Sequence, residues 1–166
     1  ESNIFEEIAE NLNVNFYKRD NFLSSNEATN DDFAIDFISK VKGDILLQLL
    51  PTSPFIEVND IDKFIKKMLD ENLDTLVSVS DIQIESMYDG RPLNFDILKK
   101  TPPSQLVTPV KAYACGIMGW KYDKFIKNIN KFGAAYHGGD GNIGYYTLKG
   151  FATVDIDNEE DFNLAE

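Results

Sequence analysis

Disulfides and histidine chemistry are the first things this chain lacks. It holds one cysteine, Cys115, which excludes an internal disulfide and is typical of a protein from a reducing compartment such as the cytoplasm. Its one histidine, His137, has no Cys or carboxylate beside it at nucleophile or zinc spacing. We therefore expect a surface-loop histidine, and covalent nucleophilic catalysis is disfavoured.

Basic residues and long apolar runs are also scarce. The 16 Lys and Arg residues face 28 Asp and Glu residues, which gives a net charge of −12 and disfavours nucleic acid as a partner. No apolar run approaches the length of a membrane span, and the run from Ile45 to Leu50 is closed by Pro51. We see no basic segment followed by an apolar one, so nothing in these residues predicts secretion. The remaining composition, 43% hydrophobic and 27% charged, suits a soluble globular domain.

What the chain does contain is an alternation of helix-like and strand-like stretches. We expect helices over 4–12, 33–41, 61–73 (capped by Asn59), 122–132 and 161–165, and strands over 14–17, 44–50, 75–79, 112–120, 143–148 and 152–156. Strands separated by helices predict an α/β fold with a three-layer, mostly parallel sheet. Residues 1–166 form a single domain in this interpretation, with an irregular excursion at about 82–110.

Two carboxylates near the end of the chain give the strongest chemical signal. Asp155 and Asp157 stand two residues apart in an otherwise apolar stretch, and in a strand they would point to the same face. Mg²⁺ is commonly bound by one or two carboxylates together with substrate phosphates. The alternative is that Asp157 is the N-cap of the last helix, with Glu160 completing a capping box. Both interpretations stay open at this point.

A polar turn closes the most apolar strand. Pro51-Thr52-Ser53-Pro54 follows that strand at the edge where open α/β sheets bind ligands, and it offers two hydroxyl groups. An ordinary strand-to-helix turn remains the alternative.

Gln48, inside the strand, could reach a ligand or pair with a neighbouring backbone group. Gly138, Gly139 and Gly141 lack phosphate-loop spacing and predict a mobile hairpin tip.

These features, in this order, resemble a known enzyme family. The turn Pro51-Thr52-Ser53-Pro54, the helix after it, and Val154-Asp155-Ile156-Asp157 before Glu160-Asp161-Phe162 are similar to the acylneuraminate cytidylyltransferase family, which includes the enzymes that activate 3-deoxy-manno-octulosonate (KDO). The resemblance extends over nearly all of the chain. It implies a nucleotide-diphospho-sugar transferase-like (Rossmann-like) fold and a cytoplasmic CMP-sugar synthetase. In such enzymes a sugar-acid hydroxyl attacks the α-phosphate of CTP and pyrophosphate leaves, which needs mainly positioning and charge neutralisation.

The resemblance also implies roles for individual residues. The catalytic and Mg²⁺-binding residues are Asp155 and Asp157; the nucleotide-binding residues are Arg19, Thr52 and Ser53; and the substrate-binding residues are Gln105, Tyr113, Cys115 and Gly116, the stretch 106–116 facing the sugar. The partners implied are CTP, a sugar acid and a second copy of the chain, which would be contacted through the excursion at about 82–110.

The chain departs from the family pattern at several places. The family opens with a strand and a loop rich in Gly, Arg, Ser and Lys that cradles the triphosphate, and we expect this chain to begin after that loop. Leu50, Ile56 and Cys115 stand where the family has Gln, Arg and Asn. Two other hypotheses stay open. One is a non-catalytic, truncated relative that binds sugar or nucleotide or serves as a dimerising module. The other, ranked last because only nine residues follow Asp157, is a glycosyltransferase with an Asp-x-Asp motif.

Overall fold

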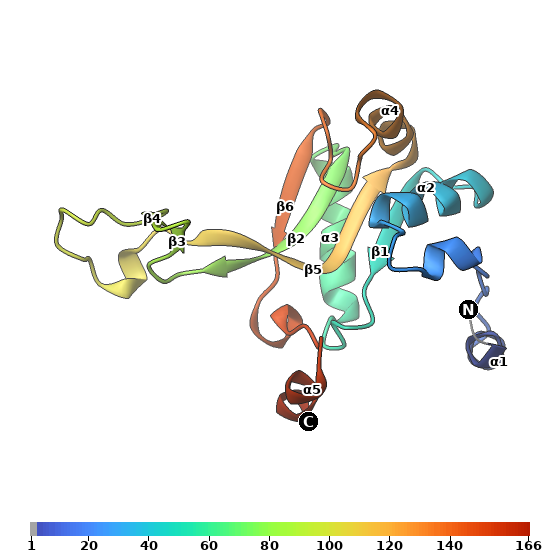
Figure 1. Ribbon diagram of the computed structural model, residues 1–166, viewed down its shortest axis with the longest axis horizontal. Helices are drawn as coiled ribbons and strands as arrows, with labels where there is room; N and C mark the ends of the chain where they lie inside the picture. The colour runs from blue at the N-terminus through green and yellow to red at the C-terminus, as the bar shows by residue number, and fades with distance from the viewer. Residues whose placement is uncertain (1–2) are drawn as a thin grey trace.

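A four-stranded sheet lies at the centre of the computed structural model, which describes residues 3–166 (Figure 1). The strand order is β1-β5-β2-β6, with β1 at Ile45–Leu49, β2 at Thr75–Ile82, β5 at Val110–Lys121 and β6 at Ile143–Thr147. β5 runs antiparallel to β1 and β2, whereas β2 and β6 are parallel. Because β1, β2 and β6 share one direction, their carboxyl ends meet at one edge of the sheet.

Three helices cover the faces of this sheet: α2 (Asn30–Lys40), α3 (Val58–Asp70) and α4 (Tyr122–Phe132). The other helices are α1 (Asn3–Asn11) and α5 (Glu159–Ala165), with short 3-10 helices η1 (Asn21–Ser24), η2 (Ser104–Leu106) and η3 (Gly150–Thr153). α3 lies behind the sheet in Figure 1, and α2 and α4 pack from the other side. The predicted α/β class and three-layer arrangement are confirmed. No helix in the described chain is long and apolar enough to cross a membrane.

Two apolar clusters form the core, one on each face of the sheet. The cluster under α2 and α4 contains Ala34, Ile38, Leu46, Val77, Met118, Trp120, Phe125 and Ala135. The cluster under α3 contains Phe64, Met68, Leu73, Leu76, Ile117, Leu148 and Ala152. Burying each large side chain of this kind contributes about 1.5–3 kcal/mol. The strands are therefore apolar on both sides, as the near-continuous apolar run of β1 predicts.

The helix expected over 61–73 begins and ends earlier than predicted. It starts at Val58, and the Asp60 carboxylate accepts a hydrogen bond from the Glu57 N–H (3.3 Å), so Glu57 rather than Asn59 is the N-cap. Its apolar periodicity was interpreted correctly, since Phe64 and Met68 are fully buried. The helix stops at Asp70 because Asn72 takes a left-handed conformation with φ 50°.

Two expected strands are not formed. Residues 14–17 have no strand pairing; of residues 152–156, the first two belong to the 3-10 helix η3 and the others pair with no strand. The reason for the second is local. Gly150 has φ +58°, and the Thr153 hydroxyl donates to the Gly150 carbonyl (2.8 Å), which turns the chain away from the sheet after β6.

Residues 83–109 leave the sheet as a long arm (Figure 1). The hairpin of β3 (Met87–Tyr88) and β4 (Arg91–Pro92) lies in it. Asn94 holds the arm together: its amide nitrogen donates to the carbonyls of Ile84 (2.9 Å) and Thr108 (2.8 Å). The arm occupies the place of the expected excursion.

Candidate functional site

A bulge in β5 shapes the carboxyl edge of the sheet. Val77 pairs with Met118 and Val79 pairs with Tyr113, so residues 114–117 lie opposite Ser78 alone. Ser78 is fully buried, and its hydroxyl accepts a hydrogen bond from the Ile117 N–H (3.0 Å) in place of the missing ladder bond.

The turn after β1 packs directly on this bulge. The Leu50 N–H donates to the Gly116 carbonyl (3.2 Å). Ser53 is 6% exposed, and a Cβ built on Gly116 would lie 3.0 Å from the Ser53 Oγ and 2.5 Å from the Ile56 Cδ1. A side chain at position 116 would have to displace the end of the Ile56 side chain and would crowd Ser53.

The segment with the two aspartates reaches the same turn. The Ile156 N–H donates to the Thr52 carbonyl (2.8 Å). Val154 and Ile156 are half-buried, whereas Asp155 and Asp157 are exposed. This alternation is that of an extended segment, in which residues two apart share a side. We infer that the two carboxylates face the same way although no strand is formed.

Asn158, not Asp157, caps the last helix. Its side-chain oxygen accepts from the N–H groups of Glu160 (2.9 Å) and Asp161 (3.1 Å). The Asp161 carboxylate completes the capping box by accepting from the Asn158 N–H (3.2 Å), and it also accepts from the Asp157 N–H (3.0 Å). The alternative interpretation of Asp157 as N-cap with Glu160 is therefore wrong, because the motif starts one residue later.

The two aspartates fit a hard divalent cation that is shared with a ligand. Across residues 3–166, neither carboxylate has a hydrogen-bond or ion-pair partner, and no group of three or more His, Cys, Asp or Glu side chains could hold a metal by itself. Mg²⁺ keeps several water molecules and often takes only one or two carboxylates, with phosphate oxygens supplying the rest. The donor set here matches that mode.

The other predicted site residues lie in different places. The Arg19 guanidinium lies over the Phe33 ring at the start of α2, 5.4 Å from its centroid. Gln105 belongs to the arm, where its carbonyl accepts from the Gln83 side chain (2.9 Å). Tyr113 is on β5 and 40% exposed. The structure thus brings Thr52, Ser53, Cys115, Gly116 and the aspartate segment together, while Gln105 is part of the arm.

Burial and nearby acidic groups set the electrostatics around Cys115. Burial, and then the Asp155 carboxylate, raise the pKa of its thiol. Burial, then Tyr145 and Cys115, raise the pKa of Tyr113. The pKa of Tyr136 rises to about 12, through burial first and then through Cys115, Tyr113 and Asp31. Cys115, Tyr113 and Tyr136 therefore lie near one another, and Asp155 acts on Cys115.

Tyr136, His137 and Tyr145 belong to this neighbourhood and were missed from the sequence. The ring of His137 lies 5.5 Å from that of Tyr113 and 5.3 Å from that of Tyr136. The expectation of an exposed loop histidine is confirmed, but its aromatic contacts were not foreseen. The only sequence signal was the density of aromatic residues between 136 and 146.

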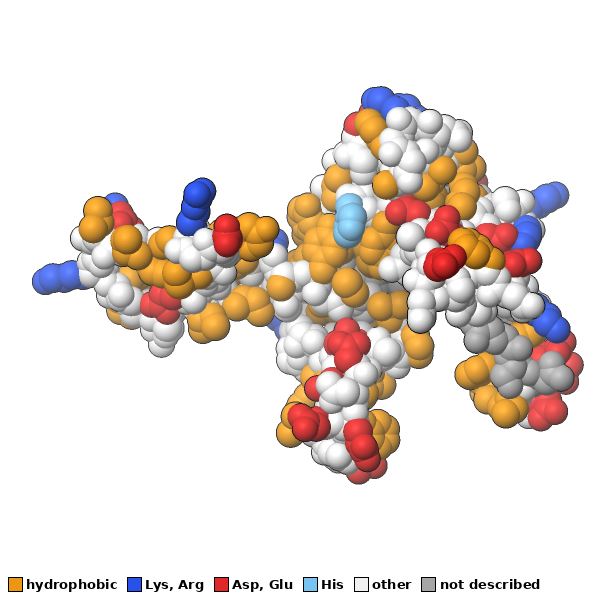
Figure 2. All heavy atoms as spheres, viewed as in Figure 1, with side chains coloured by type: hydrophobic (Ala, Val, Ile, Leu, Met, Phe, Trp, Pro, Cys, Tyr) orange, Lys and Arg blue, Asp and Glu red, His pale blue; other side chains and the backbone are white. Residues whose placement is uncertain are grey.

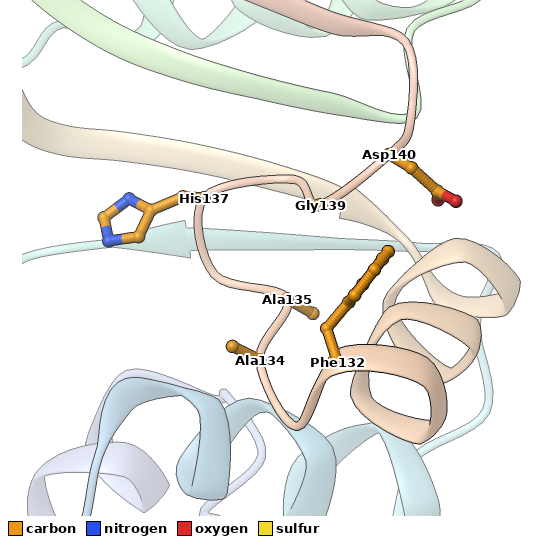
Figure 3. Close-up of a pocket in the computed structure, with 6 residues that line it drawn as sticks. All are labelled: Phe132, Ala134, Ala135, His137, Gly139 and Asp140. Atoms are coloured by element: carbon orange, nitrogen blue, oxygen red, sulfur yellow. The ribbon is translucent and has the colours of Figure 1, made fainter.

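The glycine-rich loop is anchored rather than a mobile tip. Gly138 is buried with φ +95°, and its carbonyl accepts from the buried Asn128 side chain (3.0 Å). A cavity of about 340 Å³ lies beside the loop, lined by Phe132, Ala134, Ala135, His137, Gly139 and Asp140 (Figure 3). His137 and Asp140 point in opposite directions there, and Asp140 pairs with Lys131 (2.6 Å), so they form no acid–base pair.

A second cavity opens beside Asp155. It has a volume of about 330 Å³ and lies between Phe55, Phe151 and α5, lined also by Val154, Asp155, Asp161, Leu164 and Ala165.

Gln48 has a buried side-chain oxygen without a hydrogen-bond partner in the described chain. The sequence left its role open, and backbone pairing through this oxygen is now excluded.

Comparison with known proteins supports the fold. No family model matches the chain, and no curated protein matches it. One solved structure, 4-diphosphocytidyl-2C-methyl-D-erythritol synthase from Anaerococcus prevotii DSM 20548, is similar with a TM-score of 0.62 and 12% identity, over 98% of this chain and 71% of that chain. This similarity confirms the nucleotidyltransferase-like fold that was expected. It does not support the acylneuraminate family in particular.

Proposed function

We propose that this protein is a nucleotidyltransferase of the CMP-sugar synthetase type, which transfers CMP from CTP to a sugar acid and releases pyrophosphate. The observation that carries the proposal is the meeting of three segments at one sheet edge. Two backbone hydrogen bonds, Leu50 to Gly116 and Ile156 to Thr52, place the turn, the bulge and the aspartates together. The name of the similar solved structure specifies a diphosphocytidyl product, which supports a cytidylyl transfer.

Asp155 and Asp157 would hold Mg²⁺, which when bound neutralises phosphate charge and orients the triphosphate. A net charge of −12 makes such a counter-charge necessary for binding CTP. The turn at Thr52 and Ser53 would position the nucleotide, and Cys115 and Gly116 would border the acceptor. The acceptor hydroxyl oxygen bonds to the α-phosphorus, and the hydroxyl proton passes to water. The bond between the α-phosphorus and the oxygen that bridges it to the β-phosphate breaks, so that pyrophosphate leaves. Positioning of this kind supplies most of the rate enhancement.

The arm supports assembly with a second copy of the chain. Its exposed large apolar side chains are Ile84, Met87, Tyr88, Leu93, Ile97, Leu98 and Leu106, and orange patches cover the arm in Figure 2. Apolar surface of this extent marks an interaction site. A homodimer built through the arm also suits the alternative function, a non-catalytic dimerising module.

Pyrophosphate release tests the proposal. With CTP, Mg²⁺ and either N-acetylneuraminic acid or KDO, we expect release that Asp155→Ala abolishes. Glu160→Gln is the matched control, since Glu160 is an exposed carboxylate nearby without a role in the site. Binding of CTP without pyrophosphate release would favour the alternative function, a non-catalytic relative that binds nucleotide, and full turnover in Asp155→Ala would refute the role of Asp155.

A further inference from the structure

A row of aromatic rings runs from the core to the surface beside the candidate site. Consecutive ring centroids are 5.7 Å apart for Phe125 and Trp120, 5.3 Å for Trp120 and Tyr136, 5.3 Å for Tyr136 and His137, and 5.5 Å for His137 and Tyr113. Phe125 and Trp120 are buried, whereas His137 and Tyr113 are exposed. Figure 2 shows the imidazole, the only one in the chain, over an apolar patch at the centre of the molecule.

Hydrogen bonds fix the middle of this row. The Asp31 carboxylate accepts from the N–H groups of Ala135 (2.7 Å) and Tyr136 (2.8 Å). The Tyr136 carbonyl accepts from the Trp120 indole N–H (3.0 Å). Because the backbone of Tyr136 is held on both sides, the adjacent His137 is placed before any ligand arrives, which lowers the ordering cost of binding.

The row is continuous with the bulge. Tyr113 pairs with Val79 and Tyr145 pairs with Val77, so both tyrosines lie on the α2–α4 face of the sheet, where Val77 is in the core cluster. Tyr145 is 46% exposed. Tyr113 stands on β5 three residues before Gly116, whose carbonyl accepts from the Leu50 N–H of the turn (3.2 Å). An acceptor lying against these rings would therefore border the proposed site of transfer.

The charges around these rings are acidic. The Asp31 carboxylate accepts from the N–H of Tyr136 (2.8 Å) and raises the pKa of its phenol, and the Asp155 carboxylate raises the pKa of the Cys115 thiol. An anionic group against the rings would be repelled. The three tyrosines offer hydroxyls that both donate and accept hydrogen bonds, and aromatic faces accept apolar ring surfaces.

We propose that Tyr113, Tyr136, His137 and Tyr145, named here the aromatic wall, bind the uncharged face of the acceptor's sugar ring and set its orientation. This inference rests on the proposed function in taking the acceptor to be a sugar. A carboxylate on the acceptor points away from the aromatic wall, since the neighbouring charges are Asp31 and Asp155. The wall acts by positioning the ring and takes no part in proton or phosphoryl transfer.

The single histidine gives a direct test by NMR. The imidazole signals of His137 are recorded while the 166-residue chain is titrated, without CTP or metal, with N-acetylneuraminic acid and separately with its methyl ester. We expect saturable shifts with both, and binding of the ester at least as tight as that of the acid. Tyr113→Ala and Tyr145→Ala should each weaken binding about tenfold, whereas Tyr88→Ala, an exposed tyrosine in the arm, should leave it unchanged.

Several results would overturn the inference. One is the absence of any shift with either sugar. Another is binding by Tyr113→Ala and Tyr145→Ala that is as tight as binding by the parent. A third is tighter binding of the acid than of the ester. A shift with CTP in place of the sugars would assign the aromatic wall to the nucleotide base instead. Because no CTP or metal is present in the sugar titrations, failure here is distinct from failure of the pyrophosphate assay.

Discussion

Cys115 has a backbone conformation that its residue type disfavours. Its φ of 53° lies in the left-handed region, which costs an L-residue other than Gly or Asn about 1–2 kcal/mol. The family that the chain resembles has Asn here, a residue that tolerates this region. The conformation follows from the bulge, which must turn the chain within residues 114–117.

This strain predicts the effect of a β-branched side chain. Cys115→Val should lower the free energy of unfolding by about 1–3 kcal/mol, because branching at Cβ clashes with left-handed backbone. Urea unfolding measures the loss. Cys115→Ala is the control, since it removes the thiol without branching. Equal stability of the two variants would show that the left-handed backbone does not constrain residue 115.

Sequence reasoning selected several candidate site residues because each stands at a break after an apolar run. Thr52 and Ser53 follow β1, and Asp155 and Asp157 follow the last apolar stretch. The aromatic contact of His137 with Tyr113 could not be predicted, because it joins segments far apart in the chain. Adjacent residues Asp157 and Asn158 are both good caps, so sequence alone could not choose between them.

At the scale of the element, Ser78 is what allows β5 to bulge. Ser78→Ala would leave the Ile117 N–H without its acceptor inside the sheet. We expect a loss of about 1–3 kcal/mol in the free energy of unfolding, the cost of an unsatisfied buried donor. Ser80→Ala is a suitable control on the same strand, since Ser80 is not fully buried. A Ser78→Ala protein as stable as the parent would show that this bond does not support the bulge.

Asp74 joins the amino end of β2 to its neighbours and predicts a pH dependence. Its carboxylate is 13% exposed and contacts Lys121 (3.2 Å), Lys124 (3.6 Å) and the Asn142 N–H (3.1 Å). Burial alone would raise its pKa, but the Asn142 N–H and the two lysines outweigh burial, so the pKa is lowered. The folded state thus favours the charged form. Its stabilisation is present above the unfolded-state pKa of about 4 and is lost as the pH falls through the folded-state value.

Asp74→Asn should therefore lower the free energy of unfolding by about 1–3 kcal/mol at pH 7, and the difference from the parent should shrink as the pH falls below about 4. Thermal unfolding over a pH series measures this. Asp62→Asn, an exposed carboxylate on α3, should show no such trend. A difference that is constant with pH would contradict the electrostatic assignment.

Helices and strands with a regular repeat of apolar residues were the ones that the sequence predicted best. α3 carries a strong apolar stripe and was found, although its start was misplaced. The expected strand over 152–156 was wrong, because a glycine at position 150 turns the chain before it can pair. The β5 bulge had no local signal, since it depends on a hydroxyl 39 residues away.

At the scale of the whole molecule, alternation of strands and helices was enough to predict the layered α/β fold. It could not predict that β5 runs antiparallel to its neighbours, because the irregular stretch between β2 and β5 does not indicate whether the chain crosses over the sheet or turns back beside β2. The arm itself followed from the irregular stretch at about 82–110.

The arm predicts the state of assembly. Leu98, which is 90% exposed in the arm, should lie in the homodimer contact. Sedimentation velocity should show a dimer for the parent and a monomer for Leu98→Glu. Leu164→Glu places the same charge on α5, where the leucine is 87% exposed, and should leave the dimer intact. A monomeric parent, or dissociation by both substitutions alike, would remove the arm from the interface.

Paramagnetic broadening by Mn²⁺ tests most directly whether Asp155 and Asp157 hold a metal beside the turn and the bulge. Mn²⁺ replaces Mg²⁺ at oxygen ligands and broadens the NMR signals of nearby nuclei. With CTP present, the amide signals of Thr52, Gly116 and residues 155–157 should broaden first, and the double substitution Asp155→Asn and Asp157→Asn should abolish this. Sharp signals at Thr52 and Gly116 while other acidic surfaces broaden, or broadening that survives the double substitution, would contradict the site.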